Sequence, residues 1–312
     1  MVKEKREAAL LEKARVEEKG YNWVEAARLY KQAAKAFLGK KMADEAAGAY
    51  KKLGYACYRG GRTAETTEEY RKLNRSAVKA YKEAAKLFKQ AGNRPEEVEC
   101  KAEMLFVSGS IAASVAGAKK AFSQAYEVFI ESSEHYSKDD QESLARVLSR
   151  AAIASAGTTT CCSDRREIEQ LSRKGRDVAD KAWKLSKDVG DVQSVAESLA
   201  AEVLLSMVET FIVPFRWNER WREYFRKVLL KADESLKLAE GCDDPLVLET
   251  IYSMAGNYNC FFGFQFVEDE KEQREYGDKG LGLMEKALVF LRTFNIMMSL
   301  LNIWWFMATK LP

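Results

Sequence analysis

Residues 22–37 read NWVEAARLYKQAAKAF and contain the pattern that decides the fold. Ala26, Tyr30 and Ala33 follow one another at intervals of four and three residues, so an α-helix places them on one face. Small residues on both sides of a large ring let a second helix approach closely, while the ring fills the groove between the two helices. The stretch therefore predicts an amphipathic helix with one tightly packed face.

The same pattern recurs along the chain. It returns 51 residues later in NRSAVKAYKEAAKLF and a further 48 residues later in FSQAYEVFIESSEHY. Three weaker copies follow, which makes six copies in all. The recurring positions are Ala77, Tyr81 and Ala84; Ala125, Phe129 and Ser132; Ala179 and Ala182; Ala232 and Ser235; and Met284 and Ala287.

Short polar turns separate these helices, with Gly near the expected helix stop and Asn or Asp at the expected next start. The expected N-caps are Asn22, Asn93, Asp191 and Asp244, with Glu25 three positions after the first. Each unit is thus a helix hairpin, which cannot bury its apolar face alone and must stack on its neighbours. The sequence predicts one all-α domain over residues 1–312, an α-solenoid of about six antiparallel helix hairpins. Their expected bounds are about 21–60, 62–116, 118–157, 164–213, 218–263 and 268–310.

The first hairpin resembles the tetratricopeptide repeat (TPR) family. The residues that carry the resemblance are Ala26, Tyr30 and Ala33, at the second-helix signature, and Tyr50, Leu53, Gly54 and Cys57, at the first-helix signature. The stretch EAARLYKQAAKAFLGKKMADEAAGAYKKLGY also resembles the opening hairpin of the soluble NSF attachment proteins (SNAP). The resemblance covers about the first third of the chain. It implies a right-handed superhelix that binds other proteins, although the period is about 50 residues and not the 34 of the family.

Composition agrees with a helical, globular chain. Hydrophobic residues make up 47% and charged residues 31% of 312 positions, and only four prolines interrupt potential helices. The six cysteines have no disulfide-framework spacing, and no secretory signal peptide precedes the repeats. We therefore expect a reducing, cytoplasmic location.

The sequence offers few groups for catalysis. His135 is the only histidine, which excludes histidine-rich zinc sites and the HExxH arrangement. Cys161 and Cys162 are adjacent and have no second cysteine pair for a tetrahedral metal site. The glycine-rich run 277–282, GDKGLG, follows no strand and is not followed by the GK[ST] of a phosphate-binding loop. We expect no enzymatic activity, no cofactor, no metal and no small-molecule substrate.

The resemblance implies that the first helix of each hairpin lines a concave binding face. Lys51, Tyr55, Tyr58 and Arg59 would then lie in the groove of the first hairpin. Two cations and two phenols there suit an acidic segment or a C-terminal carboxylate of a partner protein. The alternative is that these four are ordinary surface and inter-repeat residues.

Two aromatic clusters mark the C-terminal half. FIVPFRWNERWREYF contains Trp217 and Trp221, and NYNCFFGFQF contains Phe262 and Phe264. Large rings can fill wedge-shaped gaps between repeats. The functional alternative is an apolar groove for a partner helix, or a ligand pocket.

Charge and hydrophobicity leave two further functions open. The net charge of +3 conceals +8 over residues 1–100 and −5 over the rest. Lys and Arg alternate with Glu along the predicted helix faces, which is typical of a solvated surface and does not favour a nucleic acid as partner. Nucleic-acid binding by the basic N-terminal third is the alternative. Residues 293–309 carry no charge, and the segment 293–312 fits a buried solenoid helix, a docking surface or membrane contact by a SNAP-like adaptor. Because the chain stops without a polar capping hairpin, we also expect that it is the N-terminal part of a longer protein.

Overall fold

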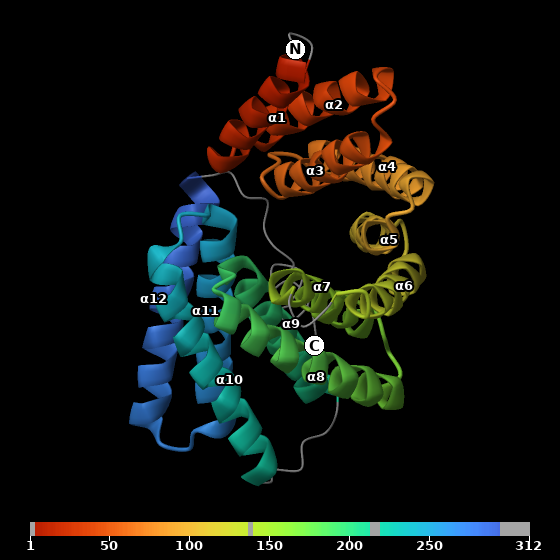
Figure 1. The fold of residues 1–312 in the computed structure, drawn as a ribbon. Helices are drawn as coiled ribbons and strands as arrows, with labels where there is room; N and C mark the ends of the chain where they lie inside the picture. The colour runs from red at the N-terminus through yellow and green to blue at the C-terminus, as the bar shows by residue number, and fades with distance from the viewer. Residues whose placement is uncertain (1–3, 137–139, 213–218, 294–312) are drawn as a thin grey trace.

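The computed structural model describes residues 4–136, 140–212 and 219–293 (Figure 1). These residues form twelve α-helices and one short 3-10 helix, with no strand among them. The helices are α1 (Glu4–Lys19), α2 (Trp23–Gly39), α3 (Ala43–Arg62), α4 (Thr67–Ala91), α5 (Arg94–Ser110), α6 (Val115–Ser133), α7 (Gln141–Thr160), α8 (Arg165–Val189), α9 (Val192–Ile212), α10 (Glu219–Leu238), η1 (Ala239–Gly241), α11 (Pro245–Phe266) and α12 (Glu270–Thr293).

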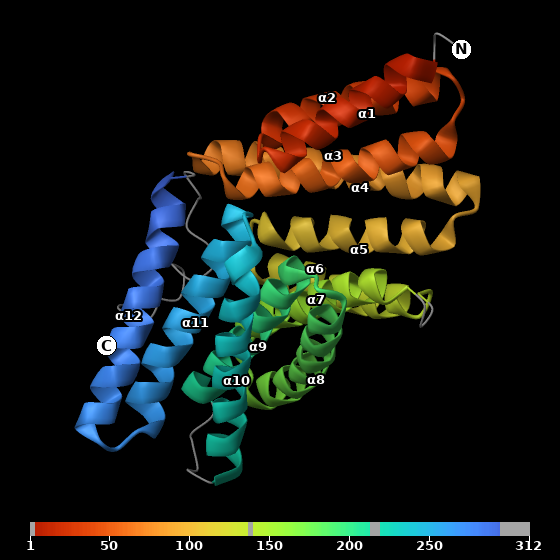
Figure 2. The ribbon, with the colours of Figure 1, turned by 60° about the vertical axis from the view of Figure 1, so that its left-hand side comes forward.

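The helices stack in sequence order. Each packs against the helices that precede and follow it, and α7 also packs on α9, which packs on α11. Helices α1 to α8 follow an arc, and α10 to α12 lie along the side that the arc leaves open (Figures 1 and 2). The predicted all-α solenoid is confirmed.

The recurring small and aromatic residues form the contact face of the even-numbered helices. Those predicted on α2, α4, α6, α8 and α10 are at most 2% exposed, and on α12 Ala287 is equally buried while Met284 is partly exposed. The weaker copies are completed by Gly175, Val228 and Gly280, all buried, four residues before the predicted pairs. The repeat therefore extends through the described chain, with glycine or valine in place of the first alanine.

The predicted caps are right at two helices and wrong at two. Asp191 accepts a hydrogen bond from the Ser194 backbone N–H at 3.2 Å, and Asp244 accepts one from Leu246 at 2.9 Å. The side chains of Asn22 and Asn93 cap nothing. Asn22 has ψ 63°, outside the extended region that a capping residue prefers, and its amide instead donates to the Glu17 carboxylate at 2.8 Å.

Several sequence predictions fall outside the described residues. Trp217 and residues 294–310 of the last predicted hairpin lie there, and so does nearly all of the candidate membrane segment 293–312. Among the helices that the structure describes, none combines the length and apolar character needed to cross a bilayer.

Candidate functional site

The odd-numbered helices α3, α5 and α7 carry a run of ion pairs where they face one another. The Lys51 ammonium lies 2.7 Å from Glu96 and 2.9 Å from Glu99, and Glu99 lies 3.2 Å from Arg146. Tyr136 also donates a hydrogen bond to Glu99 at 2.5 Å. The Glu99 carboxylate is therefore held by one ammonium, one guanidinium and one phenol.

These contacts set the protonation of Glu99. Burial by itself would raise the pKa of this carboxyl, but the Lys51 and Arg146 charges outweigh burial and lower the pKa to about 2. The same carboxylate raises the pKa of Lys51 against the opposing effect of burial. Both groups are charged near neutral pH, so their attraction contributes to stability there.

A second ion-pair group extends to α9. The Arg150 guanidinium donates to Glu103 at 2.9 and 2.5 Å and lies 3.6 Å from Glu197. It also stacks over the rings of Phe106, at 4.3 Å from the ring centre, and Tyr58, at 4.9 Å. Arg150 is 6% exposed, so these are desolvated interactions that link four consecutive hairpins.

A third group joins helices that are far apart in the sequence. The Arg59 guanidinium on α3 donates to both oxygens of Asp244, at 2.6 and 2.7 Å, across 185 residues. Beside it, Arg62 donates to Thr250 at 3.2 Å and Tyr21 donates to Asp243 at 2.7 Å. We call the contact of Arg59 with Asp244 the clasp. The clasp holds α3 against the start of α11 and so closes the arc seen in Figure 1.

Arg59 is enclosed on all sides. It is 2% exposed, its guanidinium lies 4.7 Å from the Trp23 ring centre, and the Tyr55 hydroxyl is 3.1 Å away. Burial alone would lower the pKa of Arg59, but neighbouring Tyr55 and the Asp244 carboxylate raise it overall. The clasp is thus a buried ion pair with aromatic walls.

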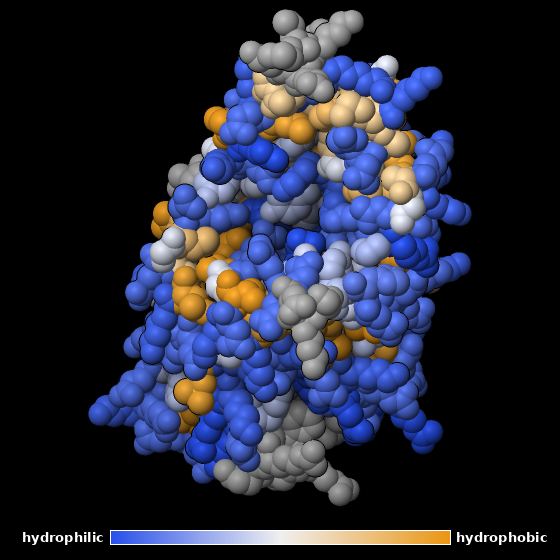
Figure 3. Space-filling view, in the orientation of Figure 1, coloured by the Kyte–Doolittle hydropathy of each residue, from blue (hydrophilic) through white to orange (hydrophobic). Residues whose placement is uncertain are grey.

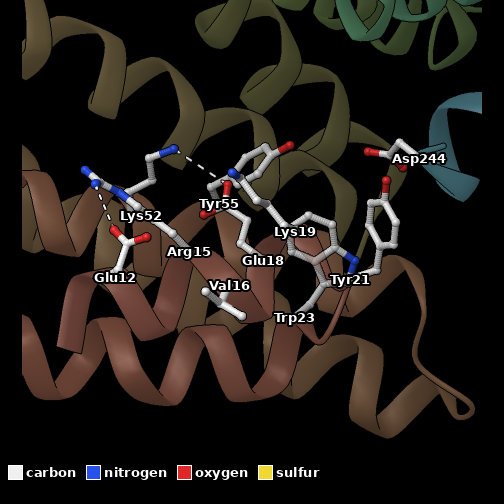
Figure 4. A pocket seen from close by; sticks show the side chains of 10 residues that line it. All are labelled: Glu12, Arg15, Val16, Glu18, Lys19, Tyr21, Trp23, Lys52, Tyr55 and Asp244. Carbon is white, nitrogen blue, oxygen red and sulfur yellow. Dashed lines mark hydrogen bonds and ion pairs between the residues drawn. The ribbon is translucent and has the colours of Figure 1, made fainter. Parts of the chain in front are cut away.

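A pocket of about 510 Å³ opens beside the clasp (Figure 4). Its aromatic wall consists of Tyr21, Trp23 and Tyr55, with Val16 of α1 also at its edge. The rings of Trp23 and Tyr55 meet edge to face, 5.8 Å between centres. The remaining lining side chains are charged: Glu12, Arg15, Glu18, Lys19, Lys52 and Asp244.

The charged side chains of the pocket differ in accessibility to a ligand. Arg15 pairs with Glu12 at 3.5 Å, and Lys52 pairs with Glu18 at 3.6 Å. The side chains of both cations are more than half exposed. Lys19 is exposed and has no ion pair among the described residues. The pocket therefore offers accessible ammonium groups next to two partly exposed tyrosine rings and the exposed side chain of Val16.

The structure brings together only part of the predicted partner-binding set. Tyr55 lines the pocket, and Arg59 packs beneath its aromatic wall. Lys51 lies in the first ion-pair group, and Tyr58 packs edge to face on Phe106 at 6.1 Å. The carboxylates that meet Lys51 and Arg59 belong to this chain.

The aromatic residues predicted as binding residues in the C-terminal half also differ in their surroundings. Phe262 is 3% exposed and packs on Phe266 and Tyr276, whereas Phe264 is 80% exposed. A pocket of about 240 Å³ touches Phe262 together with Arg222 and Arg226 of α10. Trp217 and the side chain of Trp221 lie outside the described residues.

The histidine, the cysteine pair and the glycine-rich run considered for chemistry lie on or next to different helices. No cluster of three or more His, Cys, Asp or Glu side chains suited to a metal occurs in the described parts of the chain. His135 is exposed at the end of α6, and Cys161 follows the last residue of α7. The run 277–282 lies inside α12, so it forms no phosphate-binding loop.

Sequence reasoning missed Tyr21, Trp23 and Asp244 as members of one site. Tyr21 has a positive φ of 60°, rare for a ring-bearing residue, and no local pattern announces it. Asp244 is correctly predicted as a helix start. It also binds Arg59, and that contact joins residues 185 positions apart. A period of about 50 residues gives no means of pairing residues across several repeats.

The surface seen from the front gives no large apolar area to add to these sites. Figure 3 shows a mostly hydrophilic face with small, scattered hydrophobic areas. Single exposed apolar residues of this kind are normal for a protein surface.

No protein-family model matches the chain, and no curated protein matches it. Among solved structures, one similar chain is described as a circular tandem repeat protein with novel repeat topology and enhanced subunit contact surfaces. The match covers 91% of this chain and 70% of that chain, at 13% sequence identity and a TM-score of 0.35. This likeness is too slight to bear on function, and the assignment to the helical-repeat class rests on the helices described above.

Proposed function

We propose that this chain is a non-enzymatic interaction scaffold that binds an acidic peptide segment of a partner protein. Helical-repeat solenoids present extended surfaces on which such segments bind. The observation that carries the proposal is the pocket beside the clasp, which combines aromatic surface with exposed ammonium groups.

The pocket chemistry suggests how a segment would bind. An apolar side chain of the partner would contact Val16 and the rings of Tyr21 and Tyr55. An acidic side chain, or a C-terminal carboxylate, would meet Lys19 and Lys52. In this proposal Lys51 and Arg59 do not meet the partner, because neither lines the pocket and both already have carboxylate partners within the chain.

Size and shape also support a peptide ligand. A volume of about 510 Å³ is within the range of roughly 300 to 1,000 Å³ found for ligand sites. Rigid helices supply most of the lining, so a bound segment would lose its own freedom without ordering the scaffold.

The test is selection from a random 12-residue peptide display library on the purified chain, followed by affinity measurement on single variants. Val16 lines the pocket and is 60% exposed, whereas Val24 is 58% exposed and lies outside it. We expect selected peptides to be enriched in Asp and Glu, and Val16→Glu to weaken their binding at least tenfold through repulsion and obstruction. Val24→Glu is the matched control and should leave the affinity unchanged. Equal binding by both variants, or selection of basic peptides, would contradict the proposal.

A further inference from the structure

The outer face of α4 carries a continuous row of positive charge. Six cations follow one another at intervals of four, four, three, four and three residues, which keeps them on one side of a helix. We call them the basic row: Arg71, Arg75, Lys79, Lys82, Lys86 and Lys89. All six are exposed, and the opposite side of α4 is the buried face with Ala77, Tyr81 and Ala84.

The row is straight and closely spaced. Its first and last members are separated by 18 residues, so it extends for roughly 27 Å at 1.5 Å per residue. Neighbouring members are about 5 to 6 Å apart at their Cβ atoms. Because α4 is a single uninterrupted helix packed on α3 and α5, the charges are held in line by the core.

The basic row forms no ion pairs within the described residues. None of its six members forms an ion pair with them, and the acidic residues of α4 are Glu68 and Glu69 in the first turn and Glu83. Cations on other outer helices do find partners, such as Lys187 with Glu234 at 2.6 Å. Like charges three or four residues apart repel by a few tenths of a kcal/mol per pair, a cost that a bound anion would offset.

We propose that the basic row binds the phosphate backbone of a nucleic acid, independently of the pocket beside the clasp. A linear polyanion matches a linear row of cations, and release of its counterions drives such binding. The aromatic residues of α4 offer nothing to a base, because Tyr81 and Phe88 are buried and Tyr70 donates to the Ser110 carbonyl at 3.3 Å. Binding therefore depends on phosphates and not on base sequence.

The surroundings of α4 favour a strand over a membrane. Close to the last members of the row, Arg94 reaches Glu131 of α6 at 2.7 Å. Helix α6 exposes Glu127 and Glu131 there, followed by the exposed Glu134. A flat anionic membrane would approach these carboxylates together with the row, whereas a strand can follow the row and avoid them.

The experiment measures fluorescence anisotropy of two fluorescein-labelled 20-nucleotide RNAs of unrelated sequence with the full chain. The test variant is Arg75→Glu/Lys79→Glu/Lys82→Glu. The control variant, Lys174→Glu/Lys181→Glu/Lys237→Glu, makes the same change in net charge at exposed cations of α8 and α10. Circular dichroism establishes that each variant is folded.

We expect both RNAs to bind with similar affinity. Six phosphate contacts to a single strand predict an affinity loss of roughly 300-fold between 50 and 200 mM KCl. The test variant should bind at least tenfold more weakly than the control variant, and phosphatidylserine vesicles should not bind the chain.

Three results would overturn the proposal. They are an equal loss in both variants, an affinity that does not fall with salt, and binding of the vesicles in preference to RNA. Each leaves the peptide-binding pocket untouched, because none of the substituted residues lines it.

Discussion

In the N-terminal region, α1 to α7, and the C-terminal region, α8 to α12, neighbouring helices approach each other in different ways. In the first, a ring packs on a glycine of the adjacent helix: a Cβ added at Gly54 would lie 2.9 Å from the Tyr81 ring. In the second, backbone meets backbone: a Cβ added at Gly280 would lie 2.6 Å from the Gly256 carbonyl oxygen. A ring can tilt to make room, but a helix backbone can only move away. The C-terminal joint is therefore the less tolerant of the two.

The buried carboxylates of the two regions differ as well. In the N-terminal region two cations lower the pKa of Glu99 below its usual range. In the C-terminal region burial dominates at Glu202 and raises its pKa, although Lys231 lies 2.8 Å away and opposes the shift. Arg176 also acts to lower the pKa of Glu202, but the Asp180 carboxylate adds to the effect of burial there, whereas the two cations outweigh burial at Glu99.

The largest effect is expected where the two regions are joined. Asp244→Asn keeps a good helix-capping residue but removes the charge opposite the buried Arg59. We expect a loss of about 3 kcal/mol in the free energy of unfolding, since an unpaired buried guanidinium remains. Urea denaturation followed by circular dichroism measures it.

The matched control is Asp243→Asn. This residue is exposed and only accepts the hydrogen bond from Tyr21, so we expect a loss of no more than about 1 kcal/mol. Equal losses for the two substitutions would show that the clasp does not hold the regions together.

The next largest effect on stability is expected from alanine substitutions at the two kinds of helix contact, backbone on backbone and ring on glycine. Gly280→Ala should destabilise the chain by about 2 to 3 kcal/mol because α11 and α12 must move apart, and Gly54→Ala by about 1 kcal/mol because the Tyr81 ring can shift. Thermal denaturation of both variants gives the order.

Each variant has a control on its own helix. Gly48 on α3 and Gly282 on α12 have no atom within 4 Å of an added Cβ, so alanine there should stabilise the helix by up to about 1 kcal/mol. If Gly54→Ala proves more damaging than Gly280→Ala, the contrast between the two joints is wrong.

A smaller effect is expected in the pH dependence of stability. The folded pKa of Glu99, about 2, is below that of an unfolded glutamate, so its contribution is complete above about pH 4.5 and is lost as the pH falls toward 2. Glu99→Gln should therefore cost more stability at pH 7 than at pH 2.5, where most of the contribution has been lost. Urea titrations at a series of pH values measure this.

Glu202→Gln provides the opposite case. Because the folded pKa of Glu202 is raised, its titration contributes stability below the unfolded pKa that is lost as the pH rises through the folded pKa. We expect Glu202→Gln to cost less at pH 7 than Glu99→Gln. If the cost of both substitutions changes with pH in the same direction, the contrast between the two carboxylates is wrong.

The smallest effect concerns the basic row. Lys82→Glu places an acid four residues before Lys86 and removes repulsion with Lys79, so it should stabilise the chain by a few tenths of a kcal/mol. Lys82→Gln should give an intermediate value in the same thermal denaturation series. A destabilised Lys82→Glu chain would mean that the row is compensated within the protein.

The helical fold could be predicted because it depends on local periodicity. Within eight residues, Ala26, Tyr30 and Ala33 predict a packed helix face, and the later copies of the pattern predict that such helices stack. Capping was less predictable. Asn22 has the right residue type, but the backbone after the positive φ of Tyr21 turns its side chain toward Glu17.

The candidate site could not be predicted to the same extent. Tyr55 and Arg59 were placed in the groove by the resemblance to TPR proteins, but their surroundings depend on how strongly the solenoid curves. Curvature is the sum of small rotations between hairpins, and no single stretch of sequence encodes it. For this reason the sequence predicts a partner for Arg59 in another protein, whereas the structure places Asp244 of the same chain 2.6 Å from it.

The clasp has a consequence for the number of hairpins. An open solenoid can gain or lose a unit anywhere along its length, because each unit touches only its neighbours. Here a hairpin added between α4 and α10 would carry Asp244 past Arg59 and leave both charges without a counterpart. The length of this array is thereby tied to its curvature, so the molecule tolerates changes to its side chains far better than the duplication or deletion of a whole unit.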